Sequence, residues 1–471
     1  MTSATESAAS DPLLELMHRA RLAMVEISTW DQSRIDEAVT AVAWSLYRPE
    51  HARELAELAV RDTGLGNIAD KIIKNQRKTF GTLRDLMRTR TVGILDDQPV
   101  NGVVRYGKPV GVVAAITPST NPAATPINKA IMAIKGANAI ILAPSPAGWS
   151  TTSRTAELAR EALARIGAPE DLIQVQPAPV TREATTALME LADLVVATGS
   201  QRNVRAAYRS GTPSIGVGAG NVPVIIDVDA DLDDAASKIA ASKTFDNATS
   251  CSSENSLVII DDVYEEAIAA LIRHGAHRSL PEERDALVQA LFPGGALNRD
   301  LIASDYAHLH VGLGLAGDPT GRRYVLVEED GPSPDRPLTG EKLSLVLTLY
   351  RAEDFDDAKA IVRRILDHQG AGHSMGIHTG TPQRAHELGA ELPVVRVIVN
   401  QAHAFGNGGS FDNGMPFTLT MGCGTWAGNS ISENLNVSHF INVTHVVSTI
   451  EPDEPTEEEL FGRHWAAHGR N

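Results

Sequence analysis

Short apolar segments alternate with helical patterns between residues 110 and 210, and this alternation constrains the fold more than any other feature. The expected strands are Val110–Ile116, Ala139–Ala143, 172–176 and Leu194–Ala197, and the expected helices are 123–135, 150–166, 181–191 and 201–210. Strands that alternate with helices predict βαβ units, and therefore a parallel sheet with helices on both faces. Ligands bind at the carboxyl ends of the strands in such sheets, so the loops there are candidate cofactor sites.

The patterns on either side of this block complete an α/β fold class with two parallel-sheet domains and a C-terminal arm. We divide the chain into a leader expected to be disordered (1–10), a first α/β domain (11–235, with a hairpin near 100–108), a second α/β domain (236–425) and a C-terminal strand and tail helix (426–471). Apolar spacings of three and four predict helices from residue 11, and Gly64 is a plausible C-cap. In the tail, Thr456 and Glu459 form a capping box.

Charge and cysteine content exclude several classes of protein. The net charge of −17 repels phosphate backbones, which argues against a nucleic-acid partner. Two cysteines, Cys251 and Cys423, are too few for a disulfide scaffold and argue against a thiolate metal site. No secretory signal and no apolar run of membrane-spanning length is found, so we expect a soluble, cytoplasmic protein without a membrane partner.

Cys251 is the strongest catalytic candidate. It lies in the segment FDNATSCSSEN, where small polar neighbours allow a substrate to approach the thiol closely. Backbone N–H groups in such a loop can stabilise a thiolate or an oxyanion. Considered by itself, the residue has the alternative interpretation of a buried, inert thiol.

Five segments in chain order resemble the aldehyde dehydrogenase family. They are TPSTNPAATPINKA, ATGSQRNVRAAY, GVGAGNVPVIID, DNATSCSSEN and GEKLSLVL. The resemblance implies that Cys251 attacks an aldehyde carbonyl and that the side-chain amide of Asn121 binds the oxyanion. It also implies that residues 11–235 bind a nicotinamide cofactor, that 236–425 carry the nucleophile, and that 426–471 serve oligomerisation.

Within that family, a missing carboxylate points to the CoA-acylating branch. Hydrolytic relatives keep a glutamate that activates water against the thioester, whereas Gly216 or Val217 stands at that place here. No Asp or Glu occurs from Leu194 to Ile226. Without that base a thiol acceptor takes the acyl group, so the resemblance implies CoA as co-substrate and ping-pong kinetics.

The remaining site residues follow from the same resemblance, with NAD and NADP both left open. His373, in GAGHSMGIHT, matches a histidine near the nucleophile, although a purely structural histidine is an equal alternative. Glu341 matches the carboxylate that binds the nicotinamide ribose. The predicted cofactor-binding residues are Pro118, Ser145, Thr198, Gly199, Ser200, Gly218 and Glu341, and no metal is expected.

The substrate and the assembly are further expectations. Residues 400–435 and 454–465 resemble the branch that oxidises sulfoacetaldehyde, with acetaldehyde, propionaldehyde or another short aldehyde left open. Gly408, Gly409 and Ser410 could form a small anion nest, with a flexible loop as the alternative. The run Val437–Val447 resembles the family's oligomerisation strand and predicts a homo-dimer or tetramer. Helix 11–27 matches the family's own first helix, so a microcompartment-targeting role is the less favoured interpretation.

Three rival functions remain open at this point. A hydrolytic aldehyde dehydrogenase would release the free acid without CoA. A non-catalytic assembly protein of the same fold would retain its role without Cys251. A cysteine hydrolase that uses no nicotinamide would need a base and an orienting group beside Cys251.

Overall fold

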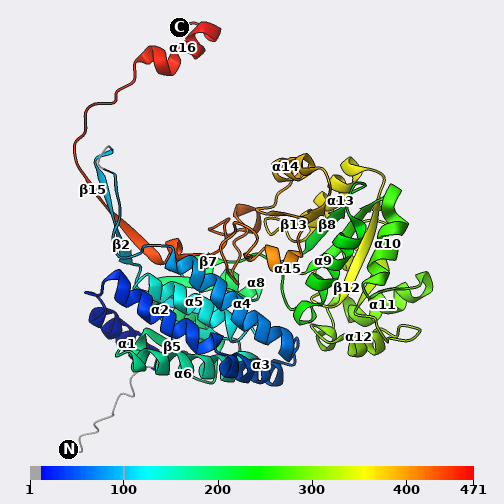
Figure 1. The fold of residues 1–471 in the computed structure, drawn as a ribbon, viewed down its shortest axis with the longest axis horizontal. Coiled ribbons are helices and arrows are strands. Elements are labelled where there is room, and N and C mark those ends of the chain that lie inside the picture. The colour runs from blue at the N-terminus through cyan, green and yellow to red at the C-terminus, as the bar shows by residue number, and fades with distance from the viewer. Residues whose placement is uncertain (1–11, 99–100, 471) are drawn as a thin grey trace, which may run out of the picture.

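The computed structural model describes residues 12–98 and 101–470, so the leader expected over 1–10 lies outside the described residues. Its strands form sheets of five, seven and three strands. The two larger sheets are wholly parallel and form the centres of two α/β bodies that lie side by side in Figure 1. The third sheet projects from the first body as an arm. The expected fold class, two parallel-sheet α/β bodies with an additional arm, is confirmed.

The first body contains a five-stranded sheet whose order is β5-β4-β3-β6-β7. Its strands are β3 (Val112–Thr117), β4 (Ala139–Pro144), β5 (Ile173–Val175), β6 (Leu194–Ala197) and β7 (Ser214–Gly216). Its helices are α1 (Pro12–Glu26), α2 (Gln32–Tyr47), α3 (Pro49–Thr63), α4 (Ile68–Met87), α5 (Ala124–Lys135), α6 (Trp149–Arg165), α7 (Arg182–Leu191) and α8 (Gln201–Arg209). Every residue of β3, β4 and β6 is buried, as expected for strands covered on both faces. Gly64 ends α3 with a φ of 67°, so the predicted C-cap is confirmed.

The second body contains a seven-stranded sheet whose order is β10-β11-β12-β9-β8-β13-β14. Its strands are β8 (Val222–Ile226), β9 (Glu254–Ile260), β10 (Ala276–Arg278), β11 (Tyr324–Glu328), β12 (Val346–Ala352), β13 (Met375–His378) and β14 (Val397–Val399). Its helices are α9 (Leu232–Thr244), α10 (Tyr264–Arg273), α11 (Arg284–Leu291), α12 (Tyr306–Gly312), α13 (Phe355–His368), α14 (Pro382–Glu391) and α15 (His403–Gly406). Because β8 pairs with β9 and β13, this sheet begins before residue 236.

The arm is an antiparallel sheet that joins distant parts of the chain. It consists of β1 (Gly93–Gln98), β2 (Val103–Pro109) and β15 (Ile441–Val447), with β2 in the centre. After β15 the chain runs out as an extended segment to α16 (Glu457–His468), which stands apart from both bodies in Figure 1. Thr456 and Glu459 form the predicted capping box at its start.

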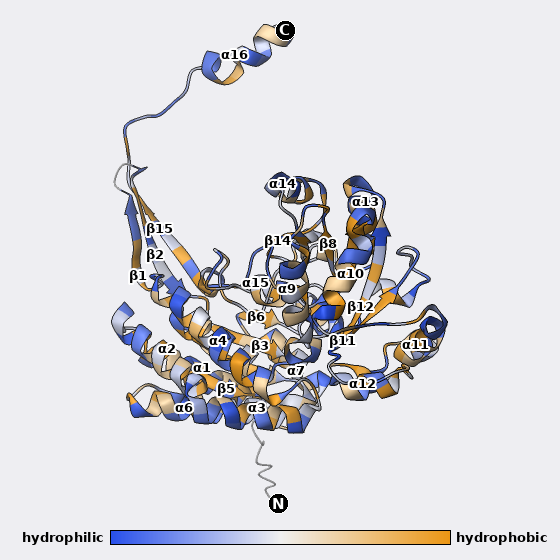
Figure 2. Cartoon of the chain, turned by 45° about the vertical axis from the view of Figure 1, so that its right-hand side comes forward, coloured by the Kyte–Doolittle hydropathy of each residue, from blue (hydrophilic) through white to orange (hydrophobic). Residues whose placement is uncertain are grey.

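Hydropathy follows this layering. In Figure 2 the strands at the centres of both bodies are mostly apolar, whereas the helices turn polar residues outward. Within the described residues, no helix combines the length and the apolar character that crossing a membrane requires.

Candidate active site

Cys251 lies where the two bodies meet. Its loop connects a 3-10 turn, η4 (Phe245–Ala248), to β9. The crossover 217–221, which leads from β7 of the first sheet to β8 of the second, passes directly against it. A Cβ atom on Gly220 would lie 2.3 Å from the Cys251 carbonyl oxygen and 2.7 Å from the Cys251 Cβ. Only glycine therefore fits at this crossing point.

His373 is the group that faces the thiol. Its Nε2 lies 3.4 Å from Cys251 Sγ, and its Nδ1 lies 2.8 Å from Ser374 Oγ. The imidazole is almost fully buried, and burial together with the Arg396 charge lowers the pKa of His373 well below its usual value. The ring is therefore neutral near pH 7 and is able to accept a proton from the thiol.

The thiol itself is protonated in this environment. Burial raises the pKa of Cys251 to about 12, and the Glu341 charge adds to the increase. Arg396 acts in the opposite direction: its buried guanidinium donates to Asn407 Oδ1 at 3.1 Å and to the Gly422 carbonyl at 3.2 Å. Without a base, the fraction of reactive thiolate at neutral pH is small.

Glu341 brings a carboxyl group close to the cysteine from a distant part of the chain. The Cβ position on Gly220 lies 2.9 Å from Glu341 Oε1, so Glu341 and Cys251 approach the same glycine. The Glu341 amide donates to Gln369 Oε1 at 3.1 Å. Burial raises the pKa of Glu341 to about 8, so this carboxyl group is largely protonated at pH 7.

A left-handed turn directly precedes the cysteine loop. Asp246, Asn247 and Ala248 have φ values of 50°, 53° and 60°, a conformation that costs about 1–2 kcal/mol for each residue with a side chain. The fully buried Asp246 carboxylate accepts hydrogen bonds from Lys71 Nζ at 3.1 Å and from Lys74 Nζ. It also accepts from the Asn67 amide at 3.0 Å and from Thr249 Oγ1 at 2.8 Å.

Asn121 follows β3 in the loop on the other side of this network. Its side-chain Nδ2 donates to Thr120 Oγ1 at 3.4 Å, and within the described residues no hydrogen bond joins Asn121 to Cys251. The two loops are linked indirectly, because Lys71 Nζ donates both to the Thr120 carbonyl, at 3.0 Å, and to Asp246.

Three predicted cofactor residues follow adjacent strands of the first sheet. Pro118 follows β3, Ser145 follows β4 and Gly199 follows β6. A Cβ atom on Gly199 would lie 3.9 Å from Pro118, so the loops after the neighbouring strands β3 and β6 are in contact. The Ser145 amide donates to the Thr117 carbonyl at 3.1 Å, whereas the buried hydroxyls of both residues have no hydrogen-bond partner in the described part of the chain. Such unpartnered hydroxyls fit the binding of a polar ligand.

The other predicted cofactor residues lie around the end of β6 and the crossover. Ser200 caps α8 by accepting from the Asn203 amide at 3.3 Å, and a helix N-terminus of this kind favours phosphate groups. Thr198 Oγ1 lies 2.7 Å from Thr420 Oγ1. Gly218 packs against the 423–427 segment, since a Cβ atom there would lie 2.8 Å from Ala427 and 3.0 Å from Cys423 Sγ.

Two of the three amides in the anion nest suggested at Gly408–Ser410 are already engaged, which argues against that nest. The Gly409 amide donates to the Gly406 carbonyl at 3.2 Å, and the Ser410 amide donates to Asn413 Oδ1 at 3.3 Å. The Gly408 carbonyl instead faces Lys78 Nζ at 2.7 Å.

Sequence reasoning missed Arg396 and the lysines of α4. Arg396 lies in an apolar strand segment that gave no functional signal. For the lysines a signal was present: Lys71, Lys74 and Lys78 recur at spacings of three and four, which places them on one helix face.

Comparisons with known proteins agree with this geometry. The model of the aldehyde dehydrogenase family matches residues 3–288. The chain is 50% identical over 467 residues to an acylating sulfoacetaldehyde dehydrogenase of Cupriavidus necator, covering 98% of this chain and 94% of that one. It is 42% identical to an acylating sulfoacetaldehyde dehydrogenase of Bilophila wadsworthia, with 97% and 99% covered.

A solved structure supports the same assignment. An acetylating aldehyde dehydrogenase from Geobacillus thermoglucosidasius superimposes with a TM-score of 0.90 at 33% identity, covering 94% of this chain and 98% of that one. Together with the thiol–imidazole contact, these similarities show that the chain belongs to the aldehyde dehydrogenase family, in its CoA-acylating branch.

Proposed function

We propose that this enzyme oxidises sulfoacetaldehyde to sulfoacetyl-CoA through a thioester on Cys251. The observation that carries the reaction is the 3.4 Å contact between the Cys251 thiol and a buried, neutral His373. The substrate proposal is supported by two relatives that are acylating sulfoacetaldehyde dehydrogenases.

Each proposed catalytic residue has one task. His373 accepts the thiol proton at Nε2, which gives the thiolate that attacks the aldehyde carbon. The developing oxyanion is stabilised by the Cys251 backbone N–H and by the Asn121 amide, whose single long hydrogen bond leaves it able to reorient. Loss of one such donor typically lowers the rate by about 10²–10³.

The residues around β3, β4 and β6 fit a nicotinamide cofactor. The unpartnered hydroxyls of Thr117 and Ser145, and the N-terminus of α8 capped by Ser200, supply polar groups for a ribose and a pyrophosphate. Bound there, NAD⁺ or NADP⁺ supplies the hydride acceptor for the oxidation. We therefore propose that the cofactor domain runs from residue 11 to the crossover at 217–221 and that the catalytic domain runs from there to residue 425. The boundary expected at 235 moves to this crossover because β8 pairs with β9.

Acyl transfer to CoA is favoured over hydrolysis by the state of Glu341. A carboxyl group beside the thioester would promote hydrolysis only as an ionised base. Because burial raises the pKa of Glu341 to about 8, it is mostly neutral at pH 7. We propose that its role is to bind the cofactor ribose, and that the CoA thiol attacks the thioester.

A spectrophotometric experiment tests this proposal. NAD⁺ and NADP⁺ are supplied separately, with sulfoacetaldehyde, with and without CoA, and reduced cofactor is recorded. We expect steady turnover only with CoA, and at most one burst equivalent without it. Cys251→Ser should abolish the signal while its circular dichroism matches the wild type. Steady turnover without CoA would identify a hydrolytic enzyme, and activity retained by Cys251→Ser would exclude the thioester mechanism.

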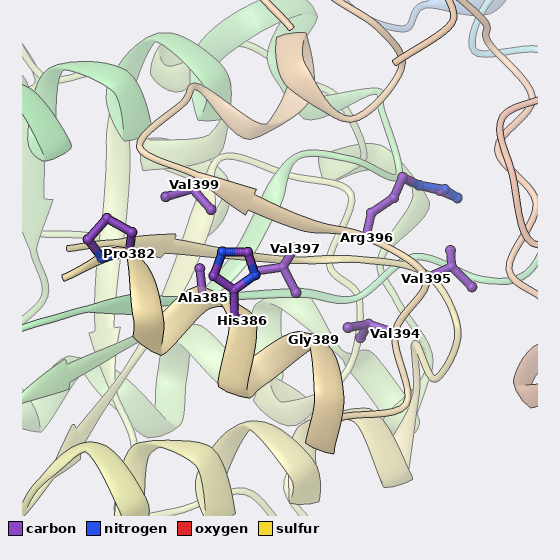
Figure 3. A pocket seen from close by; sticks show the side chains of 9 residues that line it. All are labelled: Pro382, Ala385, His386, Gly389, Val394, Val395, Arg396, Val397 and Val399. Atoms are coloured by element: carbon purple, nitrogen blue, oxygen red, sulfur yellow. The ribbon is translucent and has the colours of Figure 1, made fainter. Parts of the chain in front are cut away.

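We further propose that the arm mediates a homo-oligomer. β15 is an edge strand with three exposed valines, Val443, Val446 and Val447. The seven-stranded sheet also has an open edge at β14, beside a cleft that α14 covers on one side (Figure 3). An unpaired edge strand is a template for pairing with another chain. If β15 of one copy paired with β14 of a second copy, the free backbone groups of both edge strands would be hydrogen-bonded.

Size measurement tests the assembly. Val446→Lys should yield monomers by sedimentation, because a charge would then be buried at the shared edge. Val311→Lys, at a still more exposed valine on α12, is the control and should leave the size unchanged. A monomeric wild type, or an oligomer that survives Val446→Lys, would contradict the proposal.

A further inference from the structure

One buried cation beside the site has no carboxylate partner in the described part of the chain. Arg396 is 6% exposed, and its Nε donates to Asn407 Oδ1 at 3.1 Å. Its Nη1 donates to the Gly422 carbonyl at 3.2 Å and to Asn434 Oδ1 at 3.5 Å. All these acceptors are neutral. Burial lowers the pKa of Arg396, but arginine begins from a value far above neutral and keeps its charge. A buried charge without a counter-ion is strongly unfavourable, so this one is retained at a cost.

The backbone places this charge next to the segment that carries the catalytic histidine. Arg396 directly precedes β14, and its carbonyl accepts from the Met375 amide of β13 at 3.0 Å. His373 lies two residues before that amide. In Figure 3 the Arg396 side chain extends away from α14. Its hydrogen bonds to Asn407 and Gly422 show that it turns toward the segment 407–423 instead.

Both of these acceptors lead to the residues that react. Asn407 Nδ2 donates to Ser252 Oγ at 2.8 Å, and Ser252 is the residue after Cys251. Gly422 precedes Cys423, whose carbonyl lies directly against Gly372, the residue before His373. The guanidinium is therefore fixed between the cysteine loop on one side and the histidine segment on the other.

The ionisable groups that face Cys251 differ in how they act on its thiol. Among the described residues they come from four segments and are His373, Glu341, Cys423 and Arg396. Burial, Glu341 and Cys423 all raise the pKa of Cys251, and Arg396 is the charge that opposes them. Arg396 and His403 also lower the pKa of His373, which disfavours an imidazolium. The Arg396 charge thus favours a thiolate beside a neutral ring.

We propose that Arg396 is a positioning residue whose fixed positive charge stabilises the Cys251 thiolate. This inference rests on the proposed function, in which that thiolate attacks the aldehyde. The thiol proton leaves Cys251 Sγ for His373 Nε2, and the electron pair of the broken S–H bond stays on sulfur. The anionic sulfur then supplies the counter-charge that Arg396 lacks, and this mutual compensation offsets the cost of burying both charges.

The experiment measures the reactivity of the thiol itself. Alkylation of Cys251 by iodoacetamide at pH 7 is followed by mass spectrometry, with Cys251→Ser as the blank that reports any reaction of Cys423. Removing an adjacent opposite charge shifts a pKa by about 1–3 units, and the greater nucleophilicity of a more basic thiolate offsets about half of that. We therefore expect Arg396→Met to slow alkylation roughly 3- to 30-fold. Arg396→Lys, which keeps the charge, should restore most of the rate.

A pair of substitutions at Asn407 separates charge from packing while Arg396 stays in place. Asn407→Asp keeps the size of the side chain and adds a carboxylate against the guanidinium, so it should slow alkylation as Arg396→Met does. Asn407→Leu loses the same bond to Ser252 without adding charge and is the matched control, with a rate close to the wild type. Circular dichroism verifies the fold of each variant.

The outcomes separate this inference from the proposed function, because alkylation needs no aldehyde, nicotinamide or CoA. Equal rates in the wild type, Arg396→Met and Asn407→Asp would overturn the role of Arg396 and leave the thioester mechanism standing. Equal slowing by Asn407→Asp and Asn407→Leu would overturn it as well, since packing alone would then explain the loss. The expected order, with the wild type and Arg396→Lys fast and Arg396→Met and Asn407→Asp slow, should recur in kcat/KM with sulfoacetaldehyde.

Discussion

The carboxylate of Asp246 holds together the turn that presents Cys251, and its replacement by asparagine tests this idea. Asn keeps the size of the side chain and tolerates the left-handed conformation, which has a φ of 50° at this residue. What Asp246→Asn removes is the negative charge between Lys71 and Lys74. The substitution therefore separates the charge from the backbone preference.

The expected loss of stability follows from the burial of all three groups. Asp246 is fully buried, and the side chains of Lys71 and Lys74 are only 4% and 6% exposed. Breaking a buried ion pair by removing one partner typically costs about 3–5 kcal/mol in free energy of unfolding. Burial alone would raise the pKa of Asp246, but Lys74 and Lys71 outweigh it and hold that pKa below its usual value. This contribution to stability is present above the unfolded-state pKa and is lost in acid, as pH falls through the lowered folded-state pKa.

Urea unfolding of four proteins provides the assay. They are the wild type, Asp246→Asn, Lys74→Met and the double variant, and kcat is recorded for each. We expect the double variant to lose less free energy of unfolding than the two single variants lose together. The reason is that Lys74→Met removes a charge that Asp246→Asn leaves unpaired. The kcat should fall in Asp246→Asn, since the cysteine loop follows the turn. A single variant that loses less than about 1 kcal/mol, or strictly additive losses, would refute the reasoning.

Three further predictions concern the groups in contact with Cys251. His373→Ala should lower kcat/KM by about 10²–10⁴. Because burial raises the pKa of Cys251 to about 12, the remaining activity of this variant should rise steadily between about pH 6 and about pH 9, as the thiolate fraction grows. Gly220→Ala should abolish activity and lower the melting temperature, since its Cβ would clash with the Cys251 carbonyl at 2.3 Å; a native-like Tm with full activity would contradict this. Glu341→Gln should raise KM for the nicotinamide cofactor without increasing CoA-independent acid formation, which liquid chromatography of the products would detect.

Much of the fold could be predicted because local patterns determine it. The strand expected at Leu194–Ala197 has the same bounds in the structure, and the helix expected over 181–191 forms at Arg182–Leu191. Both are short, uniformly apolar or regularly amphipathic segments bounded by turn residues, so neighbouring residues alone define them. The division between the two sheets was harder to predict, because the pairing of β8 with β9 is a contact between chain segments that no local pattern encodes.

The functional residues could be predicted only where they lie within a recognisable sequence segment. Cys251 and His373 belong to recognisable loops, and the structure brings them within 3.4 Å. The proximity of Glu341 to the thiol depends on the β7–β8 crossover, and the left-handed turn at Asp246 occurs without a glycine to signal it. Such features are stabilised by tertiary contacts, which override local preference.

The ionisation states around Cys251 explain why a thiol, rather than water, ends the catalytic cycle. Burial keeps Glu341 mostly neutral near pH 7, so among the described residues His373 is the remaining base in contact with the nucleophile, and burial makes it a weak one. A weak base can assist a nucleophile only if that nucleophile is itself acidic. A thiol has a pKa near 8.5 and water one near 15.7, a difference of roughly 7 units, or about 10 kcal/mol in the cost of deprotonation. We therefore expect the weakly basic imidazole of His373 to assist attack by the CoA thiol but not attack by water, so that the weakness of the base selects the acceptor.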